Sequence, residues 1–321
     1  MNTRVYIDGY NLYYGCLKKS PYKWLDLKAL FESQVLPSVY HENSSPQLTN
    51  QGIKFFTAKI VEKAALDSNS TKDQEIYHNA LKKHLGDDLR LYEGYYAVNK
   101  VHAYQVQGSR LPRDCNRVEI WKLEEKQSDV NLATEALFDV VTQQDLEQIV
   151  YVSNDTDIAA SMIKVRQYND IRAAQGWKQV RIGLVIPTKS ASDPSDEETR
   201  RANKTLSDLA DWTVKHITNE WLEKSQLPHK IPNGRKPATI PISWHPESEM
   251  FALVMQELAK VHNLGQSWQW LTSVKPYVDG LIDLTSVTPL DALCSTEGAI
   301  GVYDHAKAYV GYKLSRANKA N

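Results

Sequence analysis

The chain has 321 residues, of which 42% are hydrophobic, and carries 38 Lys and Arg against 39 Asp and Glu. The hydrophobic share excludes a wholly disordered chain, and the near-neutral balance excludes a uniformly basic surface. The three cysteines form no CxxC pair, which excludes a zinc knot or a disulfide framework. Because no apolar run approaches the ~20 residues of a membrane span and no signal peptide is visible, we expect a cytoplasmic protein without a membrane partner.

Strand-like and helix-like patterns alternate over roughly the first 220 residues, which predicts a mainly parallel sheet covered by helices. The uninterrupted apolar run Ile149-Val150-Tyr151-Val152 is typical of a central buried strand. We expect strands at 5–7, 53–60, 118–121, 149–152 and 180–186, two more within 89–107 that break near Asn99-Lys100, and helices at 24–36, 73–85, from 129, from 155 and over 199–217.

A proline-rich segment interrupts this alternation. Pro228, Pro232, Pro237 and Pro241 surround Asn233-Gly234, a composition that favours turns over regular structure. Helical patterns follow at 249–262, 267–278 and 303–314. We therefore expect a large domain over residues 1–225, a linker over 226–242, and a small mainly helical domain of unknown role over 243–321.

Three acidic motifs stand where a predicted strand gives way to a loop or helix. They are Asp8-Gly9-Tyr10-Asn11, Lys126-Gln127-Ser128-Asp129-Val130 and Ser153-Asn154-Asp155-Thr156-Asp157. In an open parallel sheet the carboxyl ends of the strands meet at one edge, where ligands bind. Carboxylates gathered there repel one another unless a divalent cation neutralises them, and Mg²⁺ or Mn²⁺ prefers such oxygen ligands. The pattern predicts phosphodiester hydrolysis by a metal-activated water.

The three motifs, in this order, resemble those of NYN domains, a branch of the PIN-like ribonucleases. The resemblance covers roughly residues 1 to 220. It implies a PIN-like three-layer α/β sandwich with a central mainly parallel sheet, Mg²⁺ or Mn²⁺, and a metal-dependent ribonuclease, expected to be an endonuclease. The implied partner is single-stranded or structured RNA rather than DNA. A homo-oligomer is left open.

Carried over by residue, the resemblance makes Asp8, Asp129, Asp155 and Asp157 metal ligands and catalytic residues, with Asn11 holding a water or phosphate oxygen. Asn11, Lys126, Arg110, Arg113 and Ser153 are the expected substrate-binding residues. This sequence departs from the family pattern in three places. The glycine common in the second motif is absent between Lys126 and Asp129, Asn154 stands where the third motif usually has a glycine, and the insert over 107–117 is long. These departures put the shape of the substrate in doubt more than metal binding.

Other interpretations of the same residues stay open. Asp129 and Asp155 could cap helices, and Asp8-Gly9 could form a simple turn. Tyr10, Tyr13 and Tyr14 could stack on nucleic-acid bases, although aromatic residues near a strand end more often pack internally. As a whole the chain could also be a non-catalytic PIN-like RNA-binding or scaffold protein. A haloacid-dehalogenase-type phosphatase is disfavoured because position 10 is Tyr and not a second Asp, and a glycosyltransferase site at Asp155-Thr156-Asp157 would leave the other two motifs unused.

Overall fold

The computed structural model describes residues 1–40, 46–62, 65, 69–189, 202–232, 237–245, 247–275, 284–293 and 296–320. The chain divides into two compact units, Met1–Leu227 and Pro228–Asn321, and each is described by itself. The predicted division into 1–225, 226–242 and 243–321 remains a prediction, because compactness alone does not show that either part folds alone.

One seven-stranded sheet forms the centre of the described part of the first unit, in the order β4-β3-β2-β1-β5-β6-β7. The strands are β1 Asn2–Asp8, β2 Gln47–Ala58, β3 Leu89–Tyr104, β4 Arg117–Lys126, β5 Gln148–Val152, β6 Arg181–Val185 and β7 Trp212–Val214. Neighbouring strands are parallel except β3 and β4, which are antiparallel. Without β4, the strands in chain order occupy the 3-2-1-4-5-6 arrangement of Rossmann-like doubly wound sheets.

This arrangement corrects the expected PIN-like three-layer sandwich. The expectation rested on acidic motifs at strand ends, and such motifs mark the carboxyl edge of a parallel sheet without specifying the order of its strands. The mixed sheet, extended by an antiparallel β4, is compatible with a Rossmann-like fold and is not specific for a PIN-like one.

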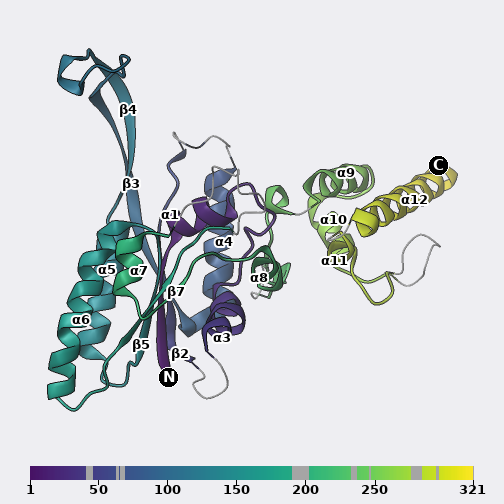
Figure 1. The fold of residues 1–321 in the computed structure, drawn as a ribbon. Helices are drawn as coiled ribbons and strands as arrows, with labels where there is room; N and C mark the ends of the chain where they lie inside the picture. The colour runs from purple at the N-terminus through teal and green to yellow at the C-terminus, as the bar shows by residue number, and fades with distance from the viewer. Residues whose placement is uncertain are drawn as a thin grey trace. The chain divides into compact units, whose positions relative to one another are not determined.

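Helices cover both faces of the sheet (Figure 1). On one face lie α1 Gly9–Leu12, η1 Tyr13–Leu17, α2 Leu27–Ala29, η2 Leu30–Val35, α3 Leu36–Val39 and α4 Ser70–Leu85. On the other lie α5 Ser128–Thr142, α6 Ala159–Ala174 and α7 Lys204–Leu209. Short 3-10 turns precede β3 (η4 Gly86–Asp88) and β4 (η5 Pro112–Asp114) and lead into α6 (η6 Thr156–Ile158), and α8 Asn219–Lys224 follows β7. Because both faces are covered, β1 and β5 are buried on each side and read as apolar runs.

Two predicted elements differ from the structure because pairing decides them. Residues 89–104 form one continuous strand without a break at Asn99-Lys100, since β4 pairs with β3 through that point. Residues 204–217 contain a six-residue helix and β7, which becomes a strand through its pairing with β6. Residues 199–201 of the helix expected there lie outside the described residues.

The second unit has its own core. It contains β8 Lys230–Ile231, β9 Ala238–Thr239, η7 Ile242–Trp244, α9 Ser248–Leu258, α10 Leu264–Leu271, α11 Pro289–Ala292 and α12 Thr296–Ala320. Phe251, Val254, Leu271 and Val302 are buried together in it. No described helix of either unit is long and apolar enough to cross a membrane.

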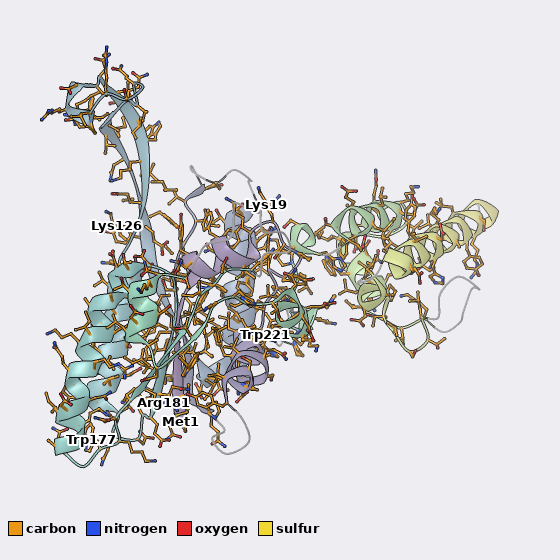
Figure 2. The ribbon with its side chains drawn as sticks, in the orientation of Figure 1. Met1, Lys19, Lys126, Trp177, Arg181 and Trp221 are labelled. Atoms are coloured by element: carbon orange, nitrogen blue, oxygen red, sulfur yellow. The ribbon has the colours of Figure 1, made fainter. Side chains whose placement is uncertain are left out.

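A buried arginine fixes the edge of the sheet opposite to the acidic motifs. Arg172 of α6 is fully buried. Its guanidinium donates hydrogen bonds to the backbone carbonyl of Lys178 and to four carbonyls at and after the end of α5, which belong to Val140, Gln143, Gln144 and Leu146. Carbonyls at a helix end and in the segment after it lack partners within the helix, so one guanidinium satisfies a carbonyl in the last turn of α5 and three in the segment that follows it. Trp177 and Arg181 in Figure 2 mark this end of the unit.

We expect Arg172→Leu to lower the free energy of unfolding by about 3 kcal/mol or more, because several buried carbonyls lose their donor at once. Arg172→Lys should recover little of this loss, since one ammonium cannot reproduce the planar fork of donors. Urea denaturation measures both. Arg181→Ala, at an exposed arginine on the same edge, serves as the control and should change stability by less than about 0.5 kcal/mol. A neutral Arg172→Leu would contradict this role.

Candidate functional site

The acidic motifs meet at the junction of β1 and β5, the two neighbouring strands where the order of the sheet reverses. Asp8 ends β1 and is 3% exposed. Its carboxylate accepts hydrogen bonds from the backbone N–H of Asn11 at 2.9 Å, from the side-chain amide of Asn11, and from the hydroxyl of Ser153 at 2.9 Å. These donors join the ends of β1 and β5 to the first turn of α1. Burial nevertheless raises the pKa of Asp8, because an ionised carboxylate loses water there.

Asp129 stands opposite, in the first turn of α5. Burial, followed by the charges of Asp8, Asp155, Glu125 and Asp157, raises the pKa of Asp129 to about 6. A carboxyl with such a pKa is ionised at neutral pH and can take up a proton readily, which is the property of a general base.

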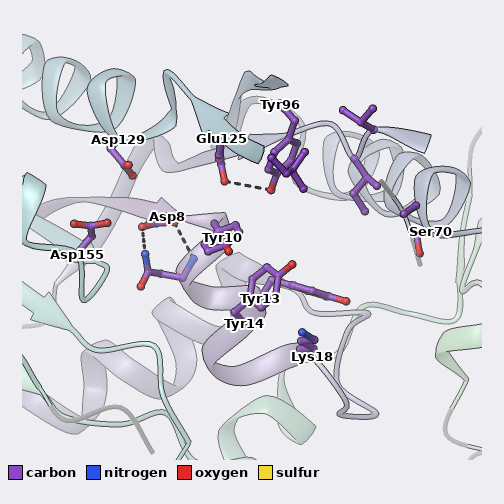
Figure 3. Close-up of a pocket in the computed structure, with 15 residues that line it drawn as sticks. Asp8, Tyr10, Tyr13, Tyr14, Lys18, Ser70, Tyr96, Glu125, Asp129 and Asp155 are labelled. Atoms are coloured by element: carbon purple, nitrogen blue, oxygen red, sulfur yellow. Dashed lines mark hydrogen bonds between the residues drawn. The ribbon is translucent and has the colours of Figure 1, made fainter. Parts of the chain in front are cut away.

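A pocket of about 410 Å³ opens over this edge (Figure 3). Its lining combines four carboxylates, four tyrosines and one lysine with small and apolar side chains. The lining residues are Asp8, Tyr10, Asn11, Tyr13, Tyr14, Lys18, Ile60, Val61, Ala65, Ser70, Tyr96, Leu123, Glu125, Asp129 and Asp155. Figure 3 shows Asp129 and Asp155 at one end, the tyrosines of α1 and η1 in the middle, and Lys18 at the other end.

Tight backbone packing positions the tyrosines. A Cβ at Gly15 would lie 1.7 Å from the carbonyl oxygen of Pro187, so only glycine lets η1 approach the chain there. Tyr10 and Tyr14 lie with ring centroids 4.4 Å apart, and Tyr13 meets Tyr14 edge-on at 5.2 Å. The ammonium of Lys18 lies 4.6 Å from the Tyr14 ring centroid. The result is a partly exposed aromatic surface with a cation at its end.

The structure brings some of the predicted site residues together and separates others. Asp8, Asn11, Asp129 and Asp155 line the pocket, while Ser153 supports Asp8 from behind. Asp155 also caps η6 by accepting the backbone N–H of Asp157 at 3.0 Å, and Asp157 itself is exposed and does not line the pocket.

The predicted substrate-binding cations do not reach this pocket. Lys126 forms an ion pair with Glu124 at 2.9 Å. Arg110 and Arg113 are exposed in the turn between β3 and β4, at the far end of the long hairpin in Figure 1. None of the three lines the pocket.

Sequence reasoning missed Glu125 and Tyr96 as site residues. They are paired across β4 and β3, and the Tyr96 hydroxyl donates to Glu125 at 3.3 Å. Burial raises the pKa of Glu125, and the charge of Asp8 adds to this effect. The acidic pair Glu124-Glu125 just before the second motif could have indicated a further site residue. Which of the two side chains faces the pocket depends on the register of the β3–β4 hairpin, and that register places Glu125 there.

A search of family models found none that matches this sequence. Among characterised proteins, the chain is 38% identical over 320 residues to 6-hydroxy-3-succinoylpyridine 3-monooxygenase HspA of Pseudomonas putida, covering 97% of this chain and 95% of that protein. The chain belongs to the family of this monooxygenase.

This relationship corrects the resemblance to NYN domains and the function drawn from it. A relative matched over nearly its whole length is named as a monooxygenase, an oxidoreductase, so the expected metal-dependent ribonuclease or endonuclease is wrong. The expected RNA partner, and the alternative of a non-catalytic RNA-binding scaffold, are corrected by the same finding. The acidic motifs misled because carboxylates at strand ends can also cap a helix, as Asp155 does here, or can have a pKa raised by burial and by one another's charges, as Asp129 does.

The expected Mg²⁺ or Mn²⁺ is corrected as well. Monooxygenases transfer an oxygen atom with electrons from a reductant, chemistry that organic redox cofactors such as flavins commonly carry, whereas the predicted cations served hydrolysis. Within the described ranges, no three or more His, Cys, Asp or Glu side chains are grouped to hold a metal ion. Burial and the charges of neighbouring carboxylates raise the pKa values of Asp8, Glu125 and Asp129, three described residues that form no such group.

A dinucleotide cofactor does not fit the position that Rossmann-like sheets usually offer. That position needs a glycine-rich turn and free N–H groups at a helix start, where the pyrophosphate binds. Here Asp8 places a carboxylate at this point and accepts the N–H of Asn11. A Cβ at Gly9 would meet the carbonyl oxygen of Phe56 at 2.6 Å, so this glycine serves packing against β2.

The raised pKa of Asp129 predicts a pH-dependent stability. Above about pH 6 the folded protein holds an ionised carboxylate that is disfavoured relative to the unfolded chain, whereas below about pH 3 the group is mostly protonated in both states. Asp129→Asn should therefore melt at a higher temperature than the parent at about pH 8, and at nearly the same temperature at about pH 3.

Thermal melts at the two pH values test this, with Asp170→Asn on the exposed surface of α6 as the control. A shift of equal size at both pH values would show that the carboxylate is not under electrostatic strain.

Proposed function

We propose that this protein is a monooxygenase that hydroxylates a hydroxypyridine carrying an acidic side chain, at the pocket between β1 and β5. The full-length relationship to 6-hydroxy-3-succinoylpyridine 3-monooxygenase carries the proposal. The pocket supports it, because a volume of about 410 Å³ suits a small bicyclic or single-ring compound, and its wall is aromatic. In the overall reaction O₂ gives one atom to position 3 of the ring and one to water. Because position 3 of 6-hydroxy-3-succinoylpyridine carries the acyl chain, the bond from the ring carbon to the acyl carbon breaks. Release of the chain as an aldehyde and formation of the dihydroxypyridine take four electrons and four protons from a reductant.

The acidic end of the pocket suits the ring hydroxyl. In a 6-hydroxypyridine, position 3 lies para to the hydroxyl, so removing the hydroxyl proton raises the electron density at position 3. Asp129 is assigned as the group that accepts this proton, because its pKa of about 6 keeps it ionised yet basic at neutral pH. Burial gives Asp129 most of this basicity, and the negative charges of Asp8 and Asp155 add to it.

The remaining surfaces orient the substrate. Tyr10, Tyr13 and Tyr14 offer ring faces and edges against which a heteroaromatic ring can stack. Lys18, at the other end, is the cation that lines the pocket and is assigned to the carboxylate of the side chain. A molecule with a proton-donating ring and an acidic tail would thus enter in one orientation, ring toward Asp129. The expected cytoplasmic location stays a prediction.

We expect the turnover of 6-hydroxy-3-succinoylpyridine to rise with pH through about 6 and to level off above it, because only ionised Asp129 accepts the proton. Asp129→Asn should lower kcat by about 10²–10⁴-fold and abolish this limb of the profile, while substrate binding persists. O₂ uptake across pH 5 to about 8 measures it. If Asp129→Asn kept the parent's profile, another group would be the base; Asp170→Asn is the matched control.

We expect Lys18→Met to raise KM for the acid about tenfold or more with little change in kcat, because the carboxylate loses its charged partner. The corresponding uncharged amide should be turned over with the same KM by parent and variant. Lys19→Met removes the neighbouring charge, which does not line the pocket, and should change neither value. Equal losses for acid and amide would show that Lys18 acts through the shape of the pocket and does not pair with the tail.

A further inference from the structure

A two-stranded arm leaves the sheet on the side of β3. The parallel pairing of β2 with β3 ends at Ala58 and Gly94, whereas β3 and β4 stay paired from Tyr95–Lys126 to Tyr104–Arg117. We call residues 95–126 the arm. Figure 1 shows it projecting beyond the other strands of the sheet. A ribbon of two strands is marginally stable in water unless something packs on it or extends it.

The arm exposes large apolar side chains within its ladder. Trp121 is 68% exposed, and Tyr104, Val118, Ile120 and Leu123 are also exposed. They lie on both faces of the ribbon, since neighbouring residues of a strand point to opposite faces. Tyr104, Trp121 and Leu123 share one face, and Val118 and Ile120 share the other. Large apolar side chains exposed in this way favour an interaction with another protein surface.

The outer edge of β4 is the open edge of the sheet. No strand in the described part of the chain pairs with it, so its backbone N–H and C=O groups are free to pair with another strand. The commonest symmetric use of such an edge is pairing with the same edge of a second copy about a twofold axis. That twofold axis is perpendicular to the sheet, so side chains on one face of the first copy share that face with the same side chains of the second copy. Because residues of a strand alternate between the two faces, an odd-numbered residue lies opposite an odd-numbered one and an even-numbered residue opposite an even-numbered one.

Charge complementarity is met in few of the registers that this symmetry allows, and one of them places Trp121 on the axis. The register with Leu123 on the axis also opposes unlike charges, Lys122 and Glu124, but these two side chains already form an ion pair within one copy. With Trp121 on the axis, Arg117 lies opposite Glu125 of the second copy, and this opposite-charge pair occurs twice. No like charges face each other in this register. A shift by two residues in one direction opposes Glu119 to Glu125 and Lys122 to itself, and the shift in the other direction leaves Arg117 opposite Leu123.

We propose that two copies of this chain associate through antiparallel pairing of their β4 edges, with the two Trp121 side chains meeting at the twofold axis. The pairing extends the marginal two-stranded ribbon into four strands and covers the exposed apolar side chains. It also affects the pocket. Leu123 and Glu125 line the pocket from β4, so the paired arm of the second copy brings its Arg117 to the rim of the acidic end.

Sedimentation velocity of the full chain over a range of concentrations tests the proposal. The parent should be a dimer, and Trp121→Lys should raise the dissociation constant about tenfold or more, because two ammonium groups would meet at the axis. Val106→Lys makes the same kind of change at a side chain that is 91% exposed but lies outside the ladder, and should leave the dimer intact.

A charge reversal tests the register. Arg117→Glu should weaken the dimer through repulsion from Glu125, and the double change Arg117→Glu with Glu125→Arg should restore it. Circular dichroism and melting temperature establish that each variant is folded. A monomeric parent, a dimer equally insensitive to Trp121→Lys and Val106→Lys, or a double variant weaker than Arg117→Glu would each overturn the proposal. None of these readouts depends on catalytic activity.

Discussion

The buried carboxylate of Asp8 is the constraint on which the site depends. Removing a charge from water is unfavourable, and the fold offsets this by aiming the donors of Asn11 and Ser153 at it. These hydrogen bonds hold the end of β1, the start of α1 and the end of β5 in one place. The direction of α1 then sets that of η1, and with it the tyrosines of the pocket. The charge of Asp8 also contributes to the raised pKa of Asp129.

The same arrangement explains why an acidic strand edge can serve an oxygenase. Carboxylates that repel one another without being grouped around a cation have raised pKa values, and a raised pKa makes a carboxylate a better proton acceptor. Hydrolysis would use the cluster to hold a metal, whereas the proposed hydroxylation uses it to remove a proton from the ring. The tyrosines and Lys18 have no part in metal binding but match an aromatic acid.

The sequence predicted the central strands and the meeting of Asp8, Asp129 and Asp155, because a fully buried strand reads as an apolar run and parallel strands end at one edge. It could not predict β7, whose three residues become a strand through β6, or the continuity of β3 through Asn99-Lys100. Glu125 could not be predicted as a site residue, because the face of the sheet to which its side chain points depends on the register of the β3–β4 hairpin. The prediction of the chemistry was wrong. Acidic residues at the carboxyl ends of parallel strands have the same spacing in the sequence whether their side chains bind a metal ion or accept a proton.

The central claim is that this protein inserts an atom of O₂ into a hydroxypyridine. Incubation of the full-length protein with 6-hydroxy-3-succinoylpyridine, a reductant and isotopically labelled O₂ tests it by mass spectrometry of the product. The account predicts one labelled oxygen atom in the product, formed at the same rate by the parent and by Asp170→Asn and far more slowly by Asp129→Asn. Product whose new oxygen comes from water, or substrate left unchanged under every supplied reductant, would contradict it.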